Sequence, residues 1–486
     1  MSTSSARRVP VWIAVVAASL PMFMSTLDNL VVTNALPAMR ADLGASIEEL
    51  QWFVNAFTLA FASFILAAAA LGDRIGRRTV FILGIGVFTA GSVLSALSTE
   101  PWMVTASRAL SGFGAAGIMP LSLTLLAGSV PDRLRPAMIG IWGGVAGLGV
   151  ALGPLIGGAV VEGWNWQAIF WLNVPVGIVA IPLALFALPN TRGARLPIDL
   201  VGVFLAGLGV LGIVFGLVRG NDAGWDSLEV TGSLVAGAAL LIAFVLWERR
   251  TPAPLLPLRL FRDRSFTVAN IAGLLFSLGM FGSVFILIQY LQVVRGASPL
   301  QAGLQTMPWT LAPMFIAPLA GLLAPRVGTR ALAVTGLTMQ TIALTWMALE
   351  MSPTVPYIDL VPAFLLAGVG MALVFAPLST AVLANMPAAD HAKASGTNST
   401  VREVGTALGV AVLTAVFTGA GGQLTPTGYV DAAVPAVLVG AAALGLGAIA
   451  ALFLPAGRGT STAPASEADA ESTSADELEQ EPAPAI

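Results

Sequence analysis

The sequence predicts an all-α integral membrane protein with fourteen transmembrane helices. Of its 486 residues, 56% are hydrophobic and only 10% are charged, and the mean hydropathy is +0.86. A water-soluble protein carries about 25% charged residues, so this chain cannot cover a globule with polar surface and must use lipid as its main solvent. It has no cysteine and one histidine, His391. We therefore expect no thiolate or imidazole metal site, no catalytic triad and no enzymatic activity.

Fourteen runs of residues are apolar and long enough to cross a bilayer, which takes about 20 residues. An even number of crossings places both ends of the chain on the same side of the membrane. In chain order the runs lie near residues 11–33, 51–71, 79–98, 102–126, 137–160, 166–188, 199–219, 230–247, 266–291, 300–324, 331–350, 357–383, 394–418 and 432–454.

The basic residues indicate which side the termini occupy. Eighteen of the 23 lysines and arginines fall in the tails and loops on the side of the termini, three fall in the opposite loops, and two lie inside the spans. Because cytoplasmic loops carry the excess of positive charge, both termini are expected in the cytoplasm. Arginine outnumbers lysine 22 to 1, which is typical of a GC-rich bacterial genome, so the expected location is the bacterial cytoplasmic membrane.

The second half of the chain repeats the first. The run GFGAAGIMPLS at 112–122 recurs as GVGMALVFAPLS at 368–379, and ALGDRIGRR at 70–78 aligns with LLAPRVGTR at 322–330. Three further glycines of the fifth span map onto glycines of the thirteenth. These matches predict two six-helix bundles with spans seven and eight inserted between them. In transporters built from such repeats, the substrate site lies between the bundles near the midplane.

This arrangement divides the chain into five parts. The last part holds seven of the 26 acidic residues and is rich in Ala, Ser, Thr and Pro, a composition typical of disorder. The predicted parts are a cytoplasmic N-terminal tail at 1–10, a first six-helix bundle at 11–188, the inserted helix pair with a cytoplasmic linker at 189–265, a second six-helix bundle at 266–455, and a disordered acidic cytoplasmic tail at 456–486.

Four charged residues lie deep inside the spans: Asp28, Arg108 and the adjacent pair Arg402 and Glu403. Burying an ionisable side chain in a membrane helix is costly, which makes each a functional candidate. Desolvation favours the neutral form of Asp28 and a nearby cation favours its charged form, so this residue is suited to binding and releasing a proton near neutral pH. Arg402 and Glu403 lie near the cytoplasmic end of span thirteen, where we expect a surface role.

The two deep residues of the first half also have structural alternatives. Asp28 would be a packed carboxylate, capped by Asn29, Thr33 or Asn34, that only fixes the first helix. Arg108 lies about one and a half turns into span four, from where its long side chain would reach the outer headgroups.

Five short motifs follow one another along the first half of the chain. They are LDNLVVTNALP at 27–37, AALGDRIGRR at 69–78, RALSGFGAA at 108–116, GVALGPLIGG at 149–158 and, after Trp166 and Phe170, NVP at 173–175. In this order and spacing they resemble the motifs of the fourteen-span drug:proton antiporter family of the major facilitator superfamily, and the likeness covers nearly the whole chain except the tail. Ala69 stands where the family usually has glycine, and Ser111 where glutamine is common.

The resemblance implies the major facilitator fold and roles for three groups of residues. It implies that Asp28 and Arg108 couple proton binding to substrate. It implies a conformational latch after the second span, whose aspartate holds the two bundles together on the cytoplasmic side; the latch residues are Asp73, Arg74, Gly76, Arg77 and Arg78. It ties the 149–158 motif to antiport, through the packing residues Gly149, Gly153, Pro154, Gly157 and Gly158.

Elementary chemistry accounts for the same residues in part. Gly76 permits a positive φ in a tight turn, and Pro325 at the corresponding place in the second half leaves only one half with the latch aspartate. Glycines at every fourth residue of the fifth span let helix backbones approach closely, and Pro154 removes one helical hydrogen bond. Plain tight packing explains the glycines equally well.

Eight uncharged residues are candidates for the substrate cavity. The register of the repeat places one of them, Met280, opposite Asp28, so that one acid would dominate the central site. Methionine and aromatic side chains around it suit bulky apolar ligands, although packing against lipid would use the same residues. The eight candidates are Asn29, Asn34, Asn270, Met280, Gln289, Gln305, Trp309 and Asn398.

The expected function is proton-coupled efflux of amphipathic small molecules, such as drugs, antibiotics and dyes, by alternating access. The proton gradient would drive it without a cofactor. The expected partners are the substrate, protons and membrane lipid, with no nucleic acid and no metal, and the expected functional unit is a monomer. A proton-coupled nutrient or metabolite symporter on the same fold is an alternative that would need directional polar groups in the cavity. A third alternative is a non-transporting sensor whose acidic tail recruits a partner.

Overall fold

The computed structural model is helical throughout the part of the chain that it describes, residues 10–131, 134–192, 199–386 and 390–455, and this part contains no strand. The all-α prediction is confirmed. The α-helices are α1 (Val11–Leu43), α2 (Ile47–Ile75), α3 (Arg77–Ala96), α4 (Pro101–Ser129), α5 (Arg135–Gly163), α6 (Gln167–Trp171), α7 (Asn173–Ala187), α8 (Leu200–Ala223), α9 (Leu228–Glu248), α10 (Arg264–Gln289), α11 (Pro299–Val327), α12 (Thr329–Glu350), α13 (Tyr357–Leu383), α14 (His391–Gly419) and α15 (Pro426–Ala451). A 3₁₀-helix η2 (Leu258–Arg262) precedes α10, and a π-helix η3 (Tyr290–Val294) follows it.

These helices account for the fourteen predicted crossings. Twelve spans of the described chain are long and apolar enough to cross a membrane, and one of them combines α6 with α7. The remaining two crossings are α5 and α11, each of 29 residues. The sixth span is broken at Leu172. Pro175 explains the break, because it has no N–H to donate to the carbonyl of Trp171 one turn earlier.

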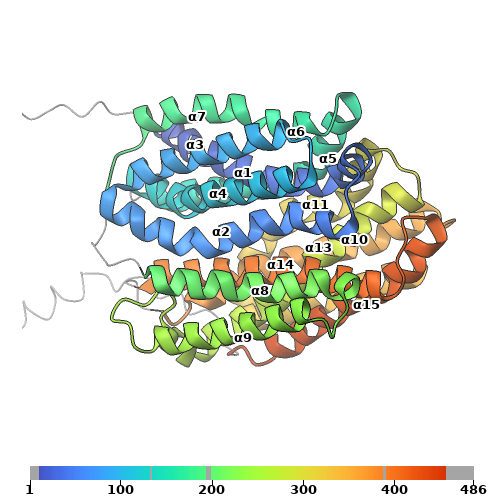
Figure 1. The fold of residues 1–486 in the computed structure, drawn as a ribbon. Helices are drawn as coiled ribbons and strands as arrows, with labels where there is room; N and C mark the ends of the chain where they lie inside the picture. Colours follow the sequence, from blue (N-terminus) through green and yellow to red (C-terminus); the bar gives the residue numbers. More distant parts are fainter. Residues whose placement is uncertain (1–9, 132–133, 193–198, 387–389, 456–486) are drawn as a thin grey trace, which may run out of the picture.

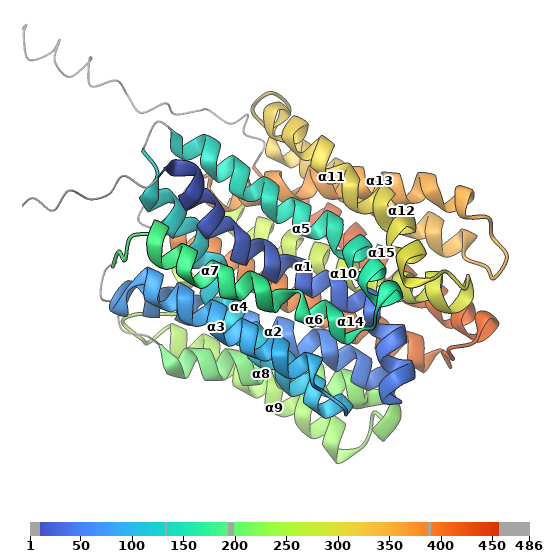
Figure 2. The same ribbon diagram turned by 90° about the horizontal axis from the view of Figure 1, so that it is seen from above.

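The helices form two bundles and a peripheral pair (Figure 1). Helices α1 to α7 pack together, α10 to α15 pack together, and α8 and α9 pack on each other. The two bundles meet along two seams, α5 against α11 and α2 against α14, with α1 facing α10 between the seams. The peripheral pair lies beside the second seam, where α8 contacts both α2 and α14 (Figure 2).

Glycines of the sequence repeat make equivalent close contacts in the two bundles. A Cβ atom at Gly112 of α4 would lie 2.2 Å from the carbonyl oxygen of Phe57 on α2, and one at Gly368 of α13 would lie 2.4 Å from that of Trp309 on α11. Gly149 and Gly153 of α5 lie against α1, and their counterparts Gly405 and Gly409 of α14 lie against the backbone of α10. The repeat seen in the sequence is therefore a repeat of backbone-to-backbone helix contacts, which only glycine permits.

Polar contacts hold α8 to the second bundle. The side-chain amide of Asn221 donates to the carbonyl oxygen of Ala415 and to the hydroxyl of Thr418, both on α14. Toward α2, the contact is made by apolar side chains and by the close approach of Gly207 to Ser63. No hydrogen bond between α8 and α2 is found within the residues that the structure covers.

Two glycines on α3 provide a matched test of this packing. Replacing Gly84 by alanine places a Cβ 2.8 Å from the carbonyl oxygen of Gly114 on α4, whereas a Cβ at Gly86 meets nothing within 4 Å. We expect Gly84→Ala to destabilise the protein by about 1–3 kcal/mol through overpacking, and Gly86→Ala to stabilise it by about 0.5–1 kcal/mol through helix propensity. Thermal unfolding in detergent measures both, and a Gly84→Ala variant as stable as Gly86→Ala would contradict the packing described here.

Candidate functional site

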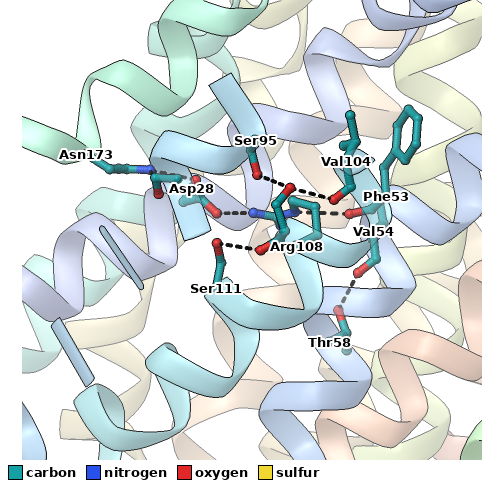
Figure 3. Close-up of polar contacts among 11 residues, drawn as sticks. Asp28, Phe53, Val54, Thr58, Ser95, Val104, Arg108, Ser111 and Asn173 are labelled. Atoms are coloured by element: carbon teal, nitrogen blue, oxygen red, sulfur yellow. Dashed lines mark hydrogen bonds and ion pairs between the residues drawn. The ribbon is translucent and has the colours of Figure 1, made fainter. Parts of the chain in front are cut away.

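Asp28 and Arg108 form a buried ion pair inside the first bundle (Figure 3). The side chain of Asp28 is 2% exposed and that of Arg108 is fully buried. Arg108 donates from Nη1 to the Oδ2 atom of Asp28, and from Nε to the carbonyl oxygen of Phe53 at 3.0 Å. Its guanidinium carbon also lies 4.5 Å from the centroid of the Phe57 ring, a cation–π contact. Arg108 therefore points into the bundle and not toward the headgroups.

The second carboxylate oxygen of Asp28 is also satisfied. Asn173 at the start of α7 donates to Oδ1 of Asp28 at 2.7 Å, and its amide nitrogen lies 3.1 Å from the hydroxyl of Ser92 on α3. The carboxylate thus joins α1, α4 and α7 directly, and α2 through Arg108. The Nη2 atom of Arg108 has no hydrogen-bond partner among the described residues. Removing one charge of a buried pair leaves the other uncompensated, so a change in the charge of Asp28 affects all four helices.

Two adjoining cavities lie between the bundles. The larger is bounded by Leu30 and Pro154 of the first bundle and by side chains of the second that include Met280 and Trp309. The smaller shares Leu30 and is lined by Asn29 on the same helix. No charged residue lines either cavity within the described chain.

Asp28 stands behind the wall of these cavities. It precedes Asn29 and Leu30, which line them, but its carboxylate points toward Arg108 in the interior of the first bundle (Figure 3). The expectation that this acid dominates the central site opposite Met280 is therefore wrong for this conformation. The physical reason is that an apolar cavity wall lacks the donors that a buried carboxylate requires.

Asn34 ties the two bundles together near the ends of α1 and α10 and the start of α11. Its Nδ2 atom donates to the carbonyl oxygens of Pro154 on α5, at 2.7 Å, and Pro299 on α11, at 3.0 Å. Gln292 of η3 donates to the side-chain and backbone oxygens of Asn34 at 2.7 and 2.9 Å. Glu162 at the end of α5 accepts hydrogen bonds from the first residues of α11. We call Asn34, Glu162, Gln292 and Pro299 the clasp.

The packing residues of the 149–158 motif fall on two faces of α5. The face toward α1, within the first bundle, carries Gly149, Gly153 and Gly157. Pro154 and Gly158 instead face α11 of the second bundle. A Cβ atom on Gly158 would lie 2.2 Å from the carbonyl oxygen of Pro299, and one on Gly303 would lie 2.4 Å from that of Pro154. One motif therefore serves both the inside of a bundle and the seam between bundles.

Within the described residues, no hydrogen bond or ion pair joins the latch residues to the second bundle. Asp73 accepts a hydrogen bond from Nε of Arg77, one turn further along, at 2.7 Å, and Arg78 donates to carbonyl oxygens near the end of α7. Arg74 is exposed, and Gly76 has the expected positive φ of 125°. The contact of Asp73 with the other bundle stays a prediction for another conformation. In the present one Asp73 pairs with Arg77, and the clasp joins the bundles at the opposite ends of the helices.

Three of the eight cavity candidates line the cavities: Asn29, Met280 and Trp309. The indole Nε1 of Trp309 is buried without a hydrogen-bond partner in the described chain, so it is a donor that a ligand in the larger cavity would satisfy. Asn34 belongs to the clasp instead. Its two carbonyl acceptors hold it at the seam.

The other four candidates do not line either cavity. Asn270 accepts a hydrogen bond from Asn398 at 3.2 Å inside the second bundle, and Gln289 donates to the carbonyl of Phe285 on its own helix. Gln305 has a buried side-chain oxygen without a partner among the described residues. The sequence predicts that these polar side chains face the substrate. Asn270, Asn398 and Gln289 instead hydrogen-bond to one another or to the backbone. Gln305 does neither.

Arg402 and Glu403 are not surface residues, contrary to expectation. The guanidinium of Arg402 lies 4.1 Å from the ring centroid of Phe375 on α13, and its stem approaches Gly273 of α10. Both residues are half-buried. The expectation is wrong because α14 packs here against both α10 and α2, which leaves it no broad lipid or water face.

The sequence assigns no role to several residues of the site, including Glu162 and Pro299 of the clasp. Asn173 appears only as part of a motif, and Gln292 and Gly303 belong to no recognised motif. The sequence contains a signal for the two amides, Asn173 and Gln292. Each is a polar side chain near one end of a long apolar run, and a polar group in the membrane must find a hydrogen-bond partner. Gly303 carries none, because one more glycine among 52 is not informative.

Comparisons with known proteins agree with this architecture. The family model described as Major Facilitator Superfamily matches residues 18–410 and 269–482. The tetracenomycin C resistance and export protein of Streptomyces glaucescens is 32% identical over 429 residues, which cover 88% of this chain and 79% of that protein. The methylenomycin A resistance protein of Bacillus subtilis is 33% identical over 446 residues, which cover 91% of this chain and 94% of that protein.

Two further matches, one by sequence and one by structure, are also to membrane transport or resistance proteins. The multidrug resistance protein Stp of Mycobacterium tuberculosis is 33% identical over 411 residues, covering 83% of this chain and 75% of that protein. Among solved structures, the peptide transporter POT in complex with sulfate matches with a TM-score of 0.65 over 91% of this chain and 96% of that chain. Its sequence identity of 18% means that it is a likeness of fold alone.

Gly158 and Gly163 on α5 test the clasp. Gly158→Ala forces a Cβ against the backbone of Pro299, whereas Gly163→Ala meets nothing within 4 Å. A clash that costs about 1–3 kcal/mol would raise the equilibrium constant for opening the α5–α11 seam about fivefold or more. The chain has no cysteine, so Thr306→Cys, in the larger cavity, reports opening through its labelling rate with an impermeant maleimide added on the clasp side.

We expect faster labelling with Gly158→Ala and an unchanged rate with Gly163→Ala. Equal labelling rates in the two backgrounds would show that the close approach of α5 and α11 does not control access to the cavity.

Proposed function

The chain belongs to the major facilitator superfamily, and on this premise we propose that it exports amphipathic small molecules from the cell in exchange for protons. As a member of that superfamily it is a multi-pass membrane transport protein. The observation that carries the proposal is the buried Asp28–Arg108 pair directly behind the wall of an apolar cavity between the bundles. Relatives named for resistance and export support the direction of transport.

The proposed orientation places both termini in the cytoplasm. The excess of arginine in the loops on that side supports it. In this orientation the clasp lies at the outer ends of α5 and α11, so the conformation described here is closed toward the outside. Alternating access then requires the clasp to open and the latch turn around Asp73 to meet the second bundle.

Protonation of Asp28 is the proposed coupling step. It removes the negative charge opposite Arg108, and an unpaired guanidinium in the bundle is strongly unfavourable. Arg108 and Asn173 must then rearrange. Both hold α1 through Asp28, and the next two residues of α1, Asn29 and Leu30, line the cavities. A proton and a substrate therefore each bias the wall of the same cavity, which is what coupling requires.

The driving force is sufficient for accumulation outside the cell. One elementary charge that crosses a potential of 100 mV releases about 2.3 kcal/mol, which sustains a substrate gradient of about fiftyfold per proton. No cofactor is needed in this scheme. Each chain holds both bundles and the cavity between them, which supports a monomer as the functional unit.

The cavity lining supports an amphipathic, neutral or singly charged substrate. The larger cavity presents Met280, Phe281 and Trp309, which adapt to bulky apolar groups. Its polar side chains are two threonines, Thr306 and Thr310, and the Trp309 indole. A nutrient symporter would need directional charged or amide groups there, and the lining does not offer them.

Asp28→Asn tests the coupling. The asparagine is isosteric but cannot release a proton, so we expect drug-driven proton release from proteoliposomes to fall to the level of protein-free liposomes while substrate binding remains. Asp222→Asn is the matched control, since it makes the same change at an exposed acid paired with Arg219. Proton release that persists undiminished in Asp28→Asn would overturn the site assignment.

A further inference from the structure

Two acids of the inserted helix pair lie against each other at one end of that pair. Asp199 caps the N-terminus of α8, and Glu248 is the last residue of α9. The side chain of Glu248 is only 4% exposed. The described part of α9 packs chiefly against α8, and the charged group that faces Glu248 from α8 is Asp199. Arg249 and Arg250 follow Glu248 but are exposed.

One oxygen of each carboxyl group is fully occupied. Oδ1 of Asp199 accepts hydrogen bonds from the backbone N–H of Gly202 and from the indole of Trp247, both at 2.8 Å. Oε2 of Glu248 accepts a hydrogen bond from the backbone N–H of Leu256 at 3.0 Å. These donors fix the orientation of both carboxyl groups. They do not bind the second oxygen of either group, Oδ2 of Asp199 or Oε1 of Glu248.

Those second oxygens face each other without a donor. Oδ2 of Asp199 and Oε1 of Glu248 are buried and have no hydrogen-bond partner among the described residues. Both oxygens lie close to Gly202 of α8. A Cβ atom built on Gly202 would be 2.6 Å from Oδ2 of Asp199 and 2.8 Å from Oε1 of Glu248, so the two oxygens are neighbours. Two ionised carboxylates in such contact repel each other, and one of the pair takes up a proton. The C-terminal end of α9 adds the partial negative charge of its free carbonyls, which further disfavours an ionised Glu248.

A metal ion does not fit this place. Calcium and magnesium take six or more oxygen ligands. Among the described residues, no three acidic, histidine or cysteine side chains lie close enough together to hold a metal ion. A proton needs only the two facing oxygens. We propose that Asp199 and Glu248 share one bound proton and form a second proton site, on the inserted pair and separate from Asp28.

The shared proton controls the segment that follows α9. Glu248 holds the backbone of Leu256, and Leu255 and Leu256 line a cavity between α8, α9 and the α2–α14 seam. The lining of this cavity is almost wholly apolar and includes Leu59 of α2 and Val404 of α14. Loss of the proton places two negative charges side by side. The Glu248 carboxylate then moves away from Asp199 and carries with it the Leu256 N–H, which an ionised carboxylate binds more strongly, so the segment is displaced and the cavity opens. In the proposed orientation this end faces the cytoplasm and responds to cytoplasmic pH.

Single-cysteine labelling tests this proposal, since the chain has no cysteine of its own. Leu256→Cys is labelled with a maleimide in proteoliposomes from about pH 5 to about pH 9, and each rate is divided by that of the unfolded protein to remove the thiol's own titration. We expect the corrected rate to rise about fivefold with pH, the factor that corresponds to about 1 kcal/mol. In the Glu248→Gln background it should stay constant, because the amide donates to Oδ2 of Asp199 at every pH.

An infrared difference titration provides the second readout. Because Asp28 is itself a proposed proton carrier, the titration is recorded in the Asp28→Asn background. There the chain should show the absorption of a protonated carboxylic acid that disappears as pH rises, and adding either Glu248→Gln or Asp199→Asn should remove it. Asp199→Asn keeps the test valid if Glu248→Gln does not fold. A corrected labelling rate independent of pH, or a titrating band that survives in both variants, would overturn the shared proton. Asp28→Asn should leave this titration intact, so failure here is distinguishable from failure of the transport proposal.

Discussion

The need to partner a buried charge organises the first bundle. The hydrocarbon core supplies no water to solvate an ionised side chain, so Asp28 is stable only because Arg108 and Asn173 surround it. Those partners come from α4 and α7, and Arg108 in turn binds the backbone of α2. One aspartate thus fixes the relative positions of four helices. In the proposed mechanism, a proton that neutralises Asp28 changes packing and charge at the same time, and the carboxylate does not need to touch the substrate.

Backbone contact is the second principle of the fold. Helices in lipid gain little from the hydrophobic effect, and associate through van der Waals packing and interhelical hydrogen bonds. The glycines of α4 and α13 bring backbones together within each bundle, and Gly158 and Gly303 do so between bundles. The contacts within a bundle and between bundles use the same chemistry. They differ in that the seam adds the polar clasp of Asn34, which can be broken and remade with water.

Much of this could be predicted from the sequence. Hydropathy gave the crossings, because a membrane span needs a long apolar run whatever it packs against, and depth in the membrane identified Asp28 and Arg108. Their partnership, and the role of Asn173, depend on contacts across 80 and 145 residues of chain, which no local pattern encodes. Asp73 shows a different limit of sequence-based prediction. A contact that forms in only one conformation is absent from the structure of another.

The position of the inserted pair has a mechanical consequence. Because α8 touches both α2 and α14, it cannot keep both contacts when the bundles tilt against each other. Asn221 is hydrogen-bonded to α14, whereas the contact with α2 is apolar and close. In the proposed alternating access, the sliding surface therefore lies on α2 and the inserted pair moves with the second bundle. The two moving units then contain six and eight crossings.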